Sequence, residues 1–248
     1  MSVSGQRDAG VRFAWGEAGA RACGGDLAVV VDVLSFSTTL TVAVERGIEV
    51  FPFRWADARA AAYASECGAV LAVGRSEARD GEVSLSPASV RRAVDVDRLV
   101  LPSPNGSTIS SALASSGTTV LGGCLRNAAS VARSVADLLD EGRGPLTVVA
   151  AGERWPDDSL RPADEDLWGA GAILAALDDR GVGGFAQEAR TAERAFRSVR
   201  DELGRALVAC ESGAELIGKG YADDVAIAGE VDSCEVVPIL EGERFVPR

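Results

Sequence analysis

Short apolar runs alternate with longer amphipathic stretches along most of the 248-residue chain. The apolar runs predict strands at residues 11–15, 27–33, 48–53, 69–74, 98–103, 118–123 and 146–152. Ala-rich stretches between them predict helices at 37–46, 56–66, 105–115, 127–140 and 164–178. Continuous apolar strands separated by helices are typical of a sheet that is covered on both faces. The pattern therefore predicts a three-layer α/β/α fold with a mostly parallel or mixed central sheet.

This rhythm changes in two places. Residues 75–97 have no regular pattern, and we expect a lid or an excursion there. Residues 184–220 predict two helices joined near Gly204, followed by short strands at 224–228, 235–240 and 243–246. Since no linker rich in Pro, Gly or Ser divides the chain, we predict one unit over residues 1–248, compatible with two lobes at about 1–145 and 146–248.

Composition limits the classes of function. The chain is 47% hydrophobic and 25% charged, which is typical of a soluble globular protein, and its net charge is −12. Because nucleic acids and anionic membranes are themselves polyanions, we expect neither as a partner. The polar N-terminus lacks the apolar segment of a signal peptide, and the five cysteines have no metal or redox spacing. We therefore expect buried thiols, a cytoplasmic location and an oligomeric state compatible with a homodimer.

The absence of histidine restricts the chemistry further. With no His in the sequence, Ser-His-Asp and Cys-His catalysis, phosphohistidine chemistry and His-ligated metals are excluded. Any acid, base or metal chemistry must use Asp, Glu, Lys, Tyr or Cys.

Polar side chains follow four of the predicted strands at the point where each strand ends. In open α/β sheets ligands bind outside the carboxyl ends of the strands, so these turns would meet at one edge of a parallel sheet. In chain order they contribute Asp32, Ser35, Ser37, Thr38 and Thr39; Asn105, Gly106, Ser107 and Thr108; Gly122, Gly123, Arg126 and Asn127; and Glu153, Asp164, Glu165 and Asp166.

These residue types suit a phosphate bridged to a metal ion. Ser37, Asn105 and Asn127 are placed to cap helices, whose free N–H groups and partial positive charge bind anions. Asp32, Glu165 and Asp166 would repel a phosphate unless a cation lay between them, and oxygen ligands suit Mg²⁺. Each motif alone is more typical of an ordinary cap or turn, and only the shared position after strands favours a site.

Five segments in order resemble the 2-phosphosulfolactate phosphatase family, which comprises Mg²⁺-dependent phosphatases of coenzyme M biosynthesis. The segments are VVVDVLSFSTT, LPSPNGSTIS, GGCLRNAASVA, VVAAGERWPDDSLRPADEDLWGAGAI and GYADDVAIAGEVDSCEVVPIL. The resemblance covers most of the chain. It implies hydrolysis of a small anionic phosphomonoester, 2-phosphosulfolactate or a related phospho-hydroxyacid, with Mg²⁺ as cofactor.

Positions matched to the family, together with the polar turns, define the candidate site. The candidate catalytic residues are Asp32, Asn105, Asn127 and Glu165, and the candidate metal ligands are Asp32, Glu165 and Asp166. The candidate substrate-binding residues are Ser35, Ser37, Thr38, Thr39, Gly106, Ser107, Arg126 and Glu153.

The sequence departs from the family pattern in two places. Ser35 and Phe36 stand where the family has Arg and a small residue, and the excursion at 75–97 is shortened to a segment that keeps SLSPAS. Arg is a natural partner for phosphate or sulfonate, so restoring it at position 35 is expected to strengthen sulfonate binding. The loss motivates an alternative function, a non-catalytic binding protein for a phosphorylated or sulfonated metabolite.

Overall fold

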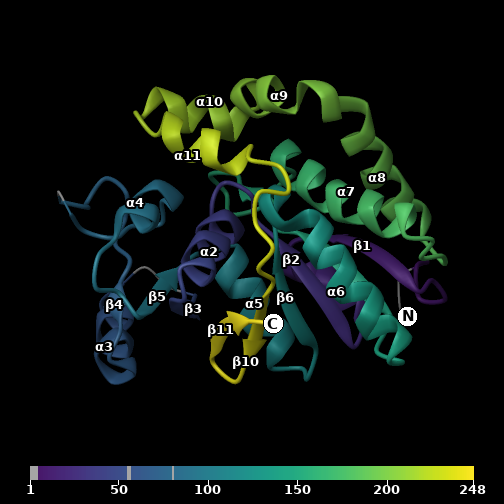
Figure 1. Cartoon of the computed structure of the whole chain (residues 1–248), viewed down its shortest axis with the longest axis horizontal. Helices are drawn as coiled ribbons and strands as arrows, with labels where there is room; N and C mark the ends of the chain where they lie inside the picture. Colours follow the sequence, from purple (N-terminus) through teal and green to yellow (C-terminus); the bar gives the residue numbers. More distant parts are fainter. Residues whose placement is uncertain (1–4, 55–56, 80) are drawn as a thin grey trace.

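The central sheet has helices on both faces, as Figure 1 shows for a computed structural model that describes residues 5–54, 57–79 and 81–248. Within these residues nine strands form one mixed sheet in the order β1-β7-β2-β6-β10-β11-β3-β5-β4. The predicted α/β/α class is confirmed. The described residues contain no helix with the length and apolarity that a bilayer crossing needs.

Two blocks of parallel strands make up most of the sheet. The first contains β1 (Val11–Trp15), β7 (Leu146–Ala150), β2 (Leu27–Val31) and β6 (Thr119–Gly123). The second contains β3 (Glu49–Phe53), β5 (Arg98–Pro102) and β4 (Val70–Leu71). An antiparallel hairpin of β10 (Pro238–Glu241) and β11 (Arg244–Pro247) joins the blocks. These strands confirm most of the predicted ones, although β4 is shorter than the expected 69–74.

The hairpin reverses the direction of the second block. Three antiparallel pairings separate β6 from β3, so the two blocks run in opposite senses. In a flat sheet the carboxyl ends of β2 and β5 would then lie at opposite edges. The Gly106 amide after β5 nevertheless donates to the Asp32 carboxylate after β2, at 2.9 Å. The sheet therefore bends strongly at the hairpin, beyond the ordinary twist of its strands.

Helices α2 (Phe36–Glu45) and α5 (Gly106–Ala114) lie inside this bend and contact strands of both blocks. Alternate β2 residues face opposite sides: Ala28 and Val30 pack with α2 and α5, whereas Val29 and Val31 pack with the other helical layer. That layer contains α6 (Ala128–Asp140), α7 (Asp164–Asp179) and α8 (Gln187–Val199). Helix α1 (Gly16–Cys23), which the pattern does not predict, packs against α5.

A helical cap crosses the carboxyl end of the first block, above α7 and α2 in Figure 1. It consists of η2 (Arg200–Glu202), α9 (Leu203–Ala209), α10 (Glu211–Gly218) and α11 (Ala222–Ala228). The predicted strand at 224–228 is wrong, because Asp223 and Asp224 stabilise the first turn of a helix by offsetting its partial positive charge. The predicted junction near Gly204 matches the break at η2 within a few residues, whereas the second break, at Cys210, was not predicted.

The remaining segments are short. Helix α3 (Ala58–Cys67) matches the predicted helix at 56–66, whose first residue lies outside the described part. The irregular segment 75–97 contains only α4 (Pro87–Arg92) among its described residues, and a small hairpin of β8 (Glu153–Arg154) and β9 (Leu160–Arg161) precedes α7. Strand β7 pairs on both sides with strands that precede residue 145, while a division into two lobes stays a prediction.

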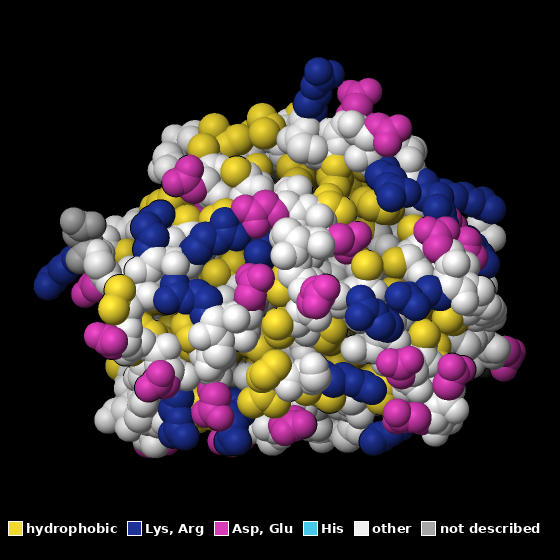
Figure 2. Space-filling view, viewed as in Figure 1, with side chains coloured by type: hydrophobic (Ala, Val, Ile, Leu, Met, Phe, Trp, Pro, Cys, Tyr) yellow, Lys and Arg dark blue, Asp and Glu magenta, His cyan; other side chains and the backbone are white. Residues whose placement is uncertain are grey.

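Figure 2 shows acidic and basic side chains interspersed over the face that it presents. Cys23, Cys124, Cys210 and Cys234 are buried and Cys67 is half-buried.

Candidate active site

Asp32 lies where the two blocks of the sheet meet. Its Oδ1 accepts the amide of Phe36 at 3.1 Å, and its Oδ2 accepts the amide of Gly106 at 2.9 Å. These amides are the first of α2 and α5, so one carboxylate caps two helices. The Ser103 hydroxyl lies 3.5 Å from Oδ2. Asp32 is 5% exposed, which leaves its carboxylate at the floor of the site.

Gly106 permits this close approach. A Cβ atom at this position would lie 2.2 Å from the Phe36 ring and 2.9 Å from the carboxylate of Asp32. Any side chain would therefore force the N-termini of α2 and α5 apart. The space that Gly106 leaves is therefore filled by Phe36 and Asp32 of the protein itself.

Most hydroxyls of the turn after Asp32 stabilise the turn itself. Ser37 Oγ accepts the Asp32 amide at 2.9 Å and donates to the Val30 carbonyl at 3.1 Å. Thr38 Oγ1 donates to the Val33 carbonyl at 2.7 Å. Thr39 Oγ1 is buried with no hydrogen-bond partner in the described part of the chain, which is unusual for a buried hydroxyl.

Two further carboxylates come from the first turn of α7. Asp166 Oδ1 accepts the Val33 amide at 2.7 Å, and its Oδ2 accepts the Gly152 amide at 2.8 Å. Asp166 therefore joins the turns that follow β2 and β7. Glu165 is 2% exposed, and its charge contributes, after burial, to raising the pKa of the Cys210 thiol to about 12. A thiol with that pKa is protonated at neutral pH and is a poor nucleophile.

Glu153 and Asn105 face each other across the site. Asn105 directly precedes α5, and its Nδ2 donates to Glu153 Oε2 at 3.0 Å. Glu153 lies in β8, immediately after the turn at Gly152. Burial, followed by the charges of Asp32 and Glu165, raises the pKa of Glu153 to about 7. The contact brings together two residues that the sequence predicted for this site.

The site carries an excess of negative charge. Burial raises the pKa of Asp32, although the amides of Phe36 and Gly106 oppose this effect. Burial, followed by the charges of Asp32 and Glu165, raises the pKa of Asp166 well above its usual range. Mutual repulsion between buried carboxylates is relieved by a cation or by a proton. In the described residues, however, no group of three or more Asp, Glu or Cys side chains is arranged to hold a metal ion.

Two arginines fasten the helical cap to this edge of the sheet. Arg75, from the loop after β4, donates from Nε to Asp224 Oδ2 in α11 at 2.9 Å, and its Nη2 contacts Ser35 Oγ. Arg161, in β9, contacts Ser212 Oγ in α10 at 3.1 Å. The charge of Arg75 lowers the pKa of Asp32, after the larger effects of burial and backbone amides.

Two cavities lie next to the loop between β5 and α5. One, of about 410 Å³, is lined by residues that include Asn105, Thr108 and Glu153. The other, of about 670 Å³, is lined by residues that include Arg75 and Tyr221. Pro104, which precedes Asn105, lines both. The first cavity therefore reaches Glu153, whereas Asp32, Glu165 and Asp166 line neither cavity.

Comparison with known proteins agrees with this arrangement. The family model for 2-phosphosulpholactate phosphatase matches residues 18–243. A 2-phosphosulfolactate phosphatase of Methanothermobacter thermautotrophicus is 34% identical over 223 residues, which are 90% of this chain and 90% of that protein. The chain belongs to the 2-phosphosulfolactate phosphatase family. It is therefore a phosphatase, and the acidic turn at Asp32 lies within the segment that matches the family.

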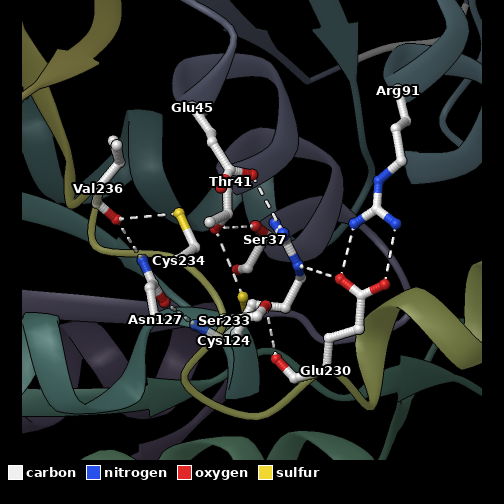
Figure 3. A network of polar contacts seen from close by, with 11 residues as sticks. Ser37, Thr41, Glu45, Arg91, Cys124, Asn127, Glu230, Ser233, Cys234 and Val236 are labelled. Atoms are coloured by element: carbon white, nitrogen blue, oxygen red, sulfur yellow. Dashed lines mark hydrogen bonds and ion pairs between the residues drawn. The ribbon is translucent and has the colours of Figure 1, made fainter.

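The structure places two of the candidate residues, Arg126 and Asn127, outside the acidic cluster. Figure 3 shows the network of polar contacts around Asn127, Glu45 and Glu230. Arg126 forms ion pairs with Glu45 at 3.0 Å and Glu230 at 3.2 Å. Glu45 ends α2, about 14 Å along the helix from the Asp32 turn. Glu230 also pairs with Arg91 at 2.7 Å. The Arg126 side chain is thus held by carboxylates of the protein.

Asn127 belongs to the same region. Its Oδ1 accepts the Cys124 amide at 2.9 Å, and its Nδ2 donates to the carbonyls of Gly122 and Val236 at 3.3 and 3.1 Å. These bonds hold the turn after β6 against the segment that leads to β10. Ser107 is similarly engaged, since its Oγ donates to the Leu101 carbonyl at 2.8 Å.

The structure adds residues that the sequence did not indicate. Two of them, Arg75 and Arg161, are arginines that lie near the acidic cluster. The third, Asp224, holds the side chain of Arg75. Arg75 and Asp224 are 149 positions apart in the chain, so no local pattern indicates their contact. Arg75 directly follows the predicted strand at 69–74 and begins the irregular segment 75–97, where the expectation of an excursion pointed to the correct part of the chain.

Proposed function

We propose that this protein hydrolyses 2-phosphosulfolactate to release inorganic phosphate, and that it requires Mg²⁺. The observation that carries the proposal is the carboxylate of Asp32, held by the first amides of two helices among three further carboxylates. Family membership supplies the reaction, and the name of the relative supplies the substrate.

The donor set fits Mg²⁺. Asp32, Glu165 and Asp166 offer hard oxygen ligands. Both oxygens of Asp32 and of Asp166 also accept a backbone amide, and each keeps a second lone pair for a cation. Mg²⁺ in proteins is often held by one or two carboxylates, with water and substrate phosphate completing its coordination. The lack of a three-residue cage among the described residues is therefore compatible with the proposal. Bound there, Mg²⁺ would polarise the phosphoryl oxygens and offset their charge.

The start of α5 is suited to hold the phosphate. The amides of Gly106 and Ile109 are bound by Asp32 and by the Asn105 carbonyl. The amides of Ser107 and Thr108 lie between them in the first turn, where a helix has no internal acceptors for its N–H groups. Such amides bind phosphate oxygens and stabilise the charge that they carry in the transition state.

Glu153 is suited to supply the proton that the leaving alkoxide needs. A group with a pKa of about 7 is present in both protonation states at neutral pH. Asn105 orients the carboxyl through its 3.0 Å hydrogen bond, and the 410 Å³ cavity gives substrate access to it. Because the chain has no His, a carboxyl with a raised pKa is a natural general acid.

The alternative is a non-catalytic binding protein for the same class of metabolite. Retention of four buried or half-buried carboxylates argues against it, because a protein that only binds a polyanion has no use for them. A cytoplasmic location and a homodimeric state remain part of the proposal, and the buried thiols favour the former.

Phosphate release tests the proposal. Purified protein is incubated with 2-phosphosulfolactate, with other phosphorylated hydroxyacids, and with a simple alkyl phosphate, in Mg²⁺ and in EDTA. We expect Mg²⁺-dependent release, fastest from 2-phosphosulfolactate. Tight binding without release would instead support the binding protein, and preference for another ester would retain the reaction but replace the substrate.

A further inference from the structure

The guanidinium of Arg75 lies beside the position where the family pattern contains an arginine. Its Nη2 contacts the hydroxyl of Ser35, the residue that replaces the family arginine and directly precedes α2. Its charge also acts on Asp32, whose pKa it lowers. The positive charge of Arg75, from the loop after β4, thus lies near the start of α2, where the family arginine would lie.

Arg75 is held firmly by the helical cap. Its Nε donates to Asp224 Oδ2 at 2.9 Å, and its guanidinium lies 5.6 Å from the ring centre of Tyr221. Asp224 is in turn fixed by the Ser86 hydroxyl at 2.6 Å and the Ala88 amide at 3.2 Å. A guanidinium that is held in this way loses little conformational entropy when it binds an anion.

Part of the guanidinium remains available to a ligand. Of its five N–H donors, one is directed to Asp224 and one to Ser35, and Nη1 forms no hydrogen bond with any residue that the structure describes. Arg75 is 17% exposed and lines the 670 Å³ cavity. Lys219, the one lysine of the chain, lines the same cavity.

The cavity ends beside the loop that leads to the proposed phosphate-binding turn. Pro104 lines it and is followed by Asn105, which precedes the phosphate-binding turn of α5. A substrate with its phosphate at α5 could therefore extend another group toward Arg75. In 2-phosphosulfolactate the groups beside the phosphate are a carboxylate and a sulfonate, and a guanidinium pairs well with either.

We propose that Arg75 binds the sulfonate or carboxylate of the substrate and so determines specificity for esters that carry a second anion. This inference rests on the proposed phosphatase function and identifies the residue that recognises the substrate within the same site. Ser35 then orients Arg75, and Asp224 is a positioning residue that holds it.

Substitution of Arg75 tests the inference with two substrates. We expect Arg75→Gln to lower kcat/KM for 2-phosphosulfolactate by 10- to 100-fold, mainly through KM, because a charge-assisted hydrogen bond is lost. Hydrolysis of propyl phosphate, which has no second anion, should change less than 3-fold. Arg75→Lys should recover part of the loss, and Asp224→Asn should raise KM for 2-phosphosulfolactate alone.

Arg79→Gln is the matched control. It removes the same charge from the same segment. Arg79 forms no hydrogen bond with Ser35 or Asp224 in the described part of the chain, so we expect wild-type kinetics. Equal losses on both substrates for Arg75→Gln, or no loss on either, would overturn the inference.

A binding measurement separates this inference from the proposed function. Calorimetry with 3-sulfolactate, the product without its phosphate, should give at least 10-fold weaker binding to Arg75→Gln than to wild type. If wild type releases no phosphate but this difference is found, the proposed activity fails and the role of Arg75 stands. If wild type is active and the two proteins bind 3-sulfolactate equally, the role of Arg75 fails alone.

Discussion

Two polar clusters follow neighbouring strands of the same sheet and differ in their balance of charge. After β6, Arg126 and Arg91 are matched by Glu45 and Glu230. After β2, Asp32 lies near three other carboxylates, and the nearby arginine is already shared with the cap. A balanced cluster stabilises the fold, whereas buried charge of one sign costs free energy unless a ligand completes it. Polar residues after a strand are therefore not sufficient to indicate a site; an unbalanced charge is the stronger indication.

Among the predicted changes, removal of the metal ion should reduce phosphatase activity most. We expect dialysis against EDTA to abolish phosphate release and Mg²⁺ or Mn²⁺ to restore it, because the carboxylates around Asp32 repel phosphate without a cation. Mg²⁺ should also raise Tm by binding the folded protein. Full turnover in excess chelator would contradict the assignment.

Replacing one acid in each cluster by its amide should distinguish a catalytic cluster from a structural one. We expect Asp32→Asn to lower kcat at least 100-fold, because the amide keeps the shape but loses the charge. Since both Asp32 oxygens accept backbone amides and the Asn amide group cannot accept, a small decrease in Tm is also expected. Glu230→Gln should lower Tm and change kcat less than 3-fold.

The measurements are steady-state kinetics and thermal unfolding of both variants, with Asp32→Asn also unfolded in EDTA. The comparison fails if Glu230→Gln reduces kcat as much as Asp32→Asn does. It also fails if Asp32→Asn retains near-normal turnover, which would leave Asp32 as a helix cap only.

The stability of the metal-free protein should depend on pH through Glu153. Its pKa rises from 4.5 to about 7 on folding, so folding favours the protonated form. The associated stability is fully present below pH 4.5 and is lost as the pH rises through 7, by up to about 3 kcal/mol. Asp32 and Asp166, whose pKa values are also raised, act in the same direction.

Thermal unfolding in EDTA at pH 5 and pH 8 checks this dependence. We expect Tm to be lower at pH 8 by about 5–10 °C for wild type and by less for Glu153→Gln. Under catalytic conditions Glu153→Gln should also lower kcat, because the amide cannot donate an acidic proton. An unchanged pH dependence of Tm in the variant would show that Glu153 is not buried among the other acids.

The sequence predicted the parts of the fold that follow from local patterns. Continuous Val-rich runs identified β2 and β7 because both faces of a central strand are apolar. Residues 224–228 also have the pattern of a strand, but the acidic first turn and tertiary packing make them helical. The bend of the sheet was not predictable, because it depends on a C-terminal hairpin that pairs between two distant blocks.

The sequence likewise predicted the parts of the candidate site that depend on local patterns. Asp32 and Glu153 meet because each follows a strand of the first block, which is a local signal. Asn105 follows β5 of the oppositely directed block and reaches them only through the bend of the sheet. Asn127 also follows a strand, but its amide donates to Val236, 109 positions away, and no pattern near Asn127 indicates that contact. Contacts with distant segments decide whether the polar groups of a turn find hydrogen-bond partners within the protein or remain available to a ligand.

The smallest expected effect concerns Ser35. From the sequence alone, Ser35→Arg should strengthen sulfonate binding by restoring the family arginine. In the structure Ser35 is 3% exposed and its hydroxyl contacts Arg75. A second guanidinium there would lie against the first and would have to be accommodated beside the Phe36 ring, so repulsion and crowding offset the added attraction.

We therefore expect Ser35→Arg to leave KM for 2-phosphosulfolactate unchanged or to raise it a few-fold, with a lower Tm. The double variant Ser35→Arg with Arg75→Gln removes the repulsion, and it should recover part of the affinity that Arg75→Gln loses. Recovery would indicate that the two positions can supply the same cation to one anion, because a guanidinium from either segment would then reach it. A lower KM for Ser35→Arg alone would show instead that the site has room for two arginines, and that Arg75 does not replace the missing one.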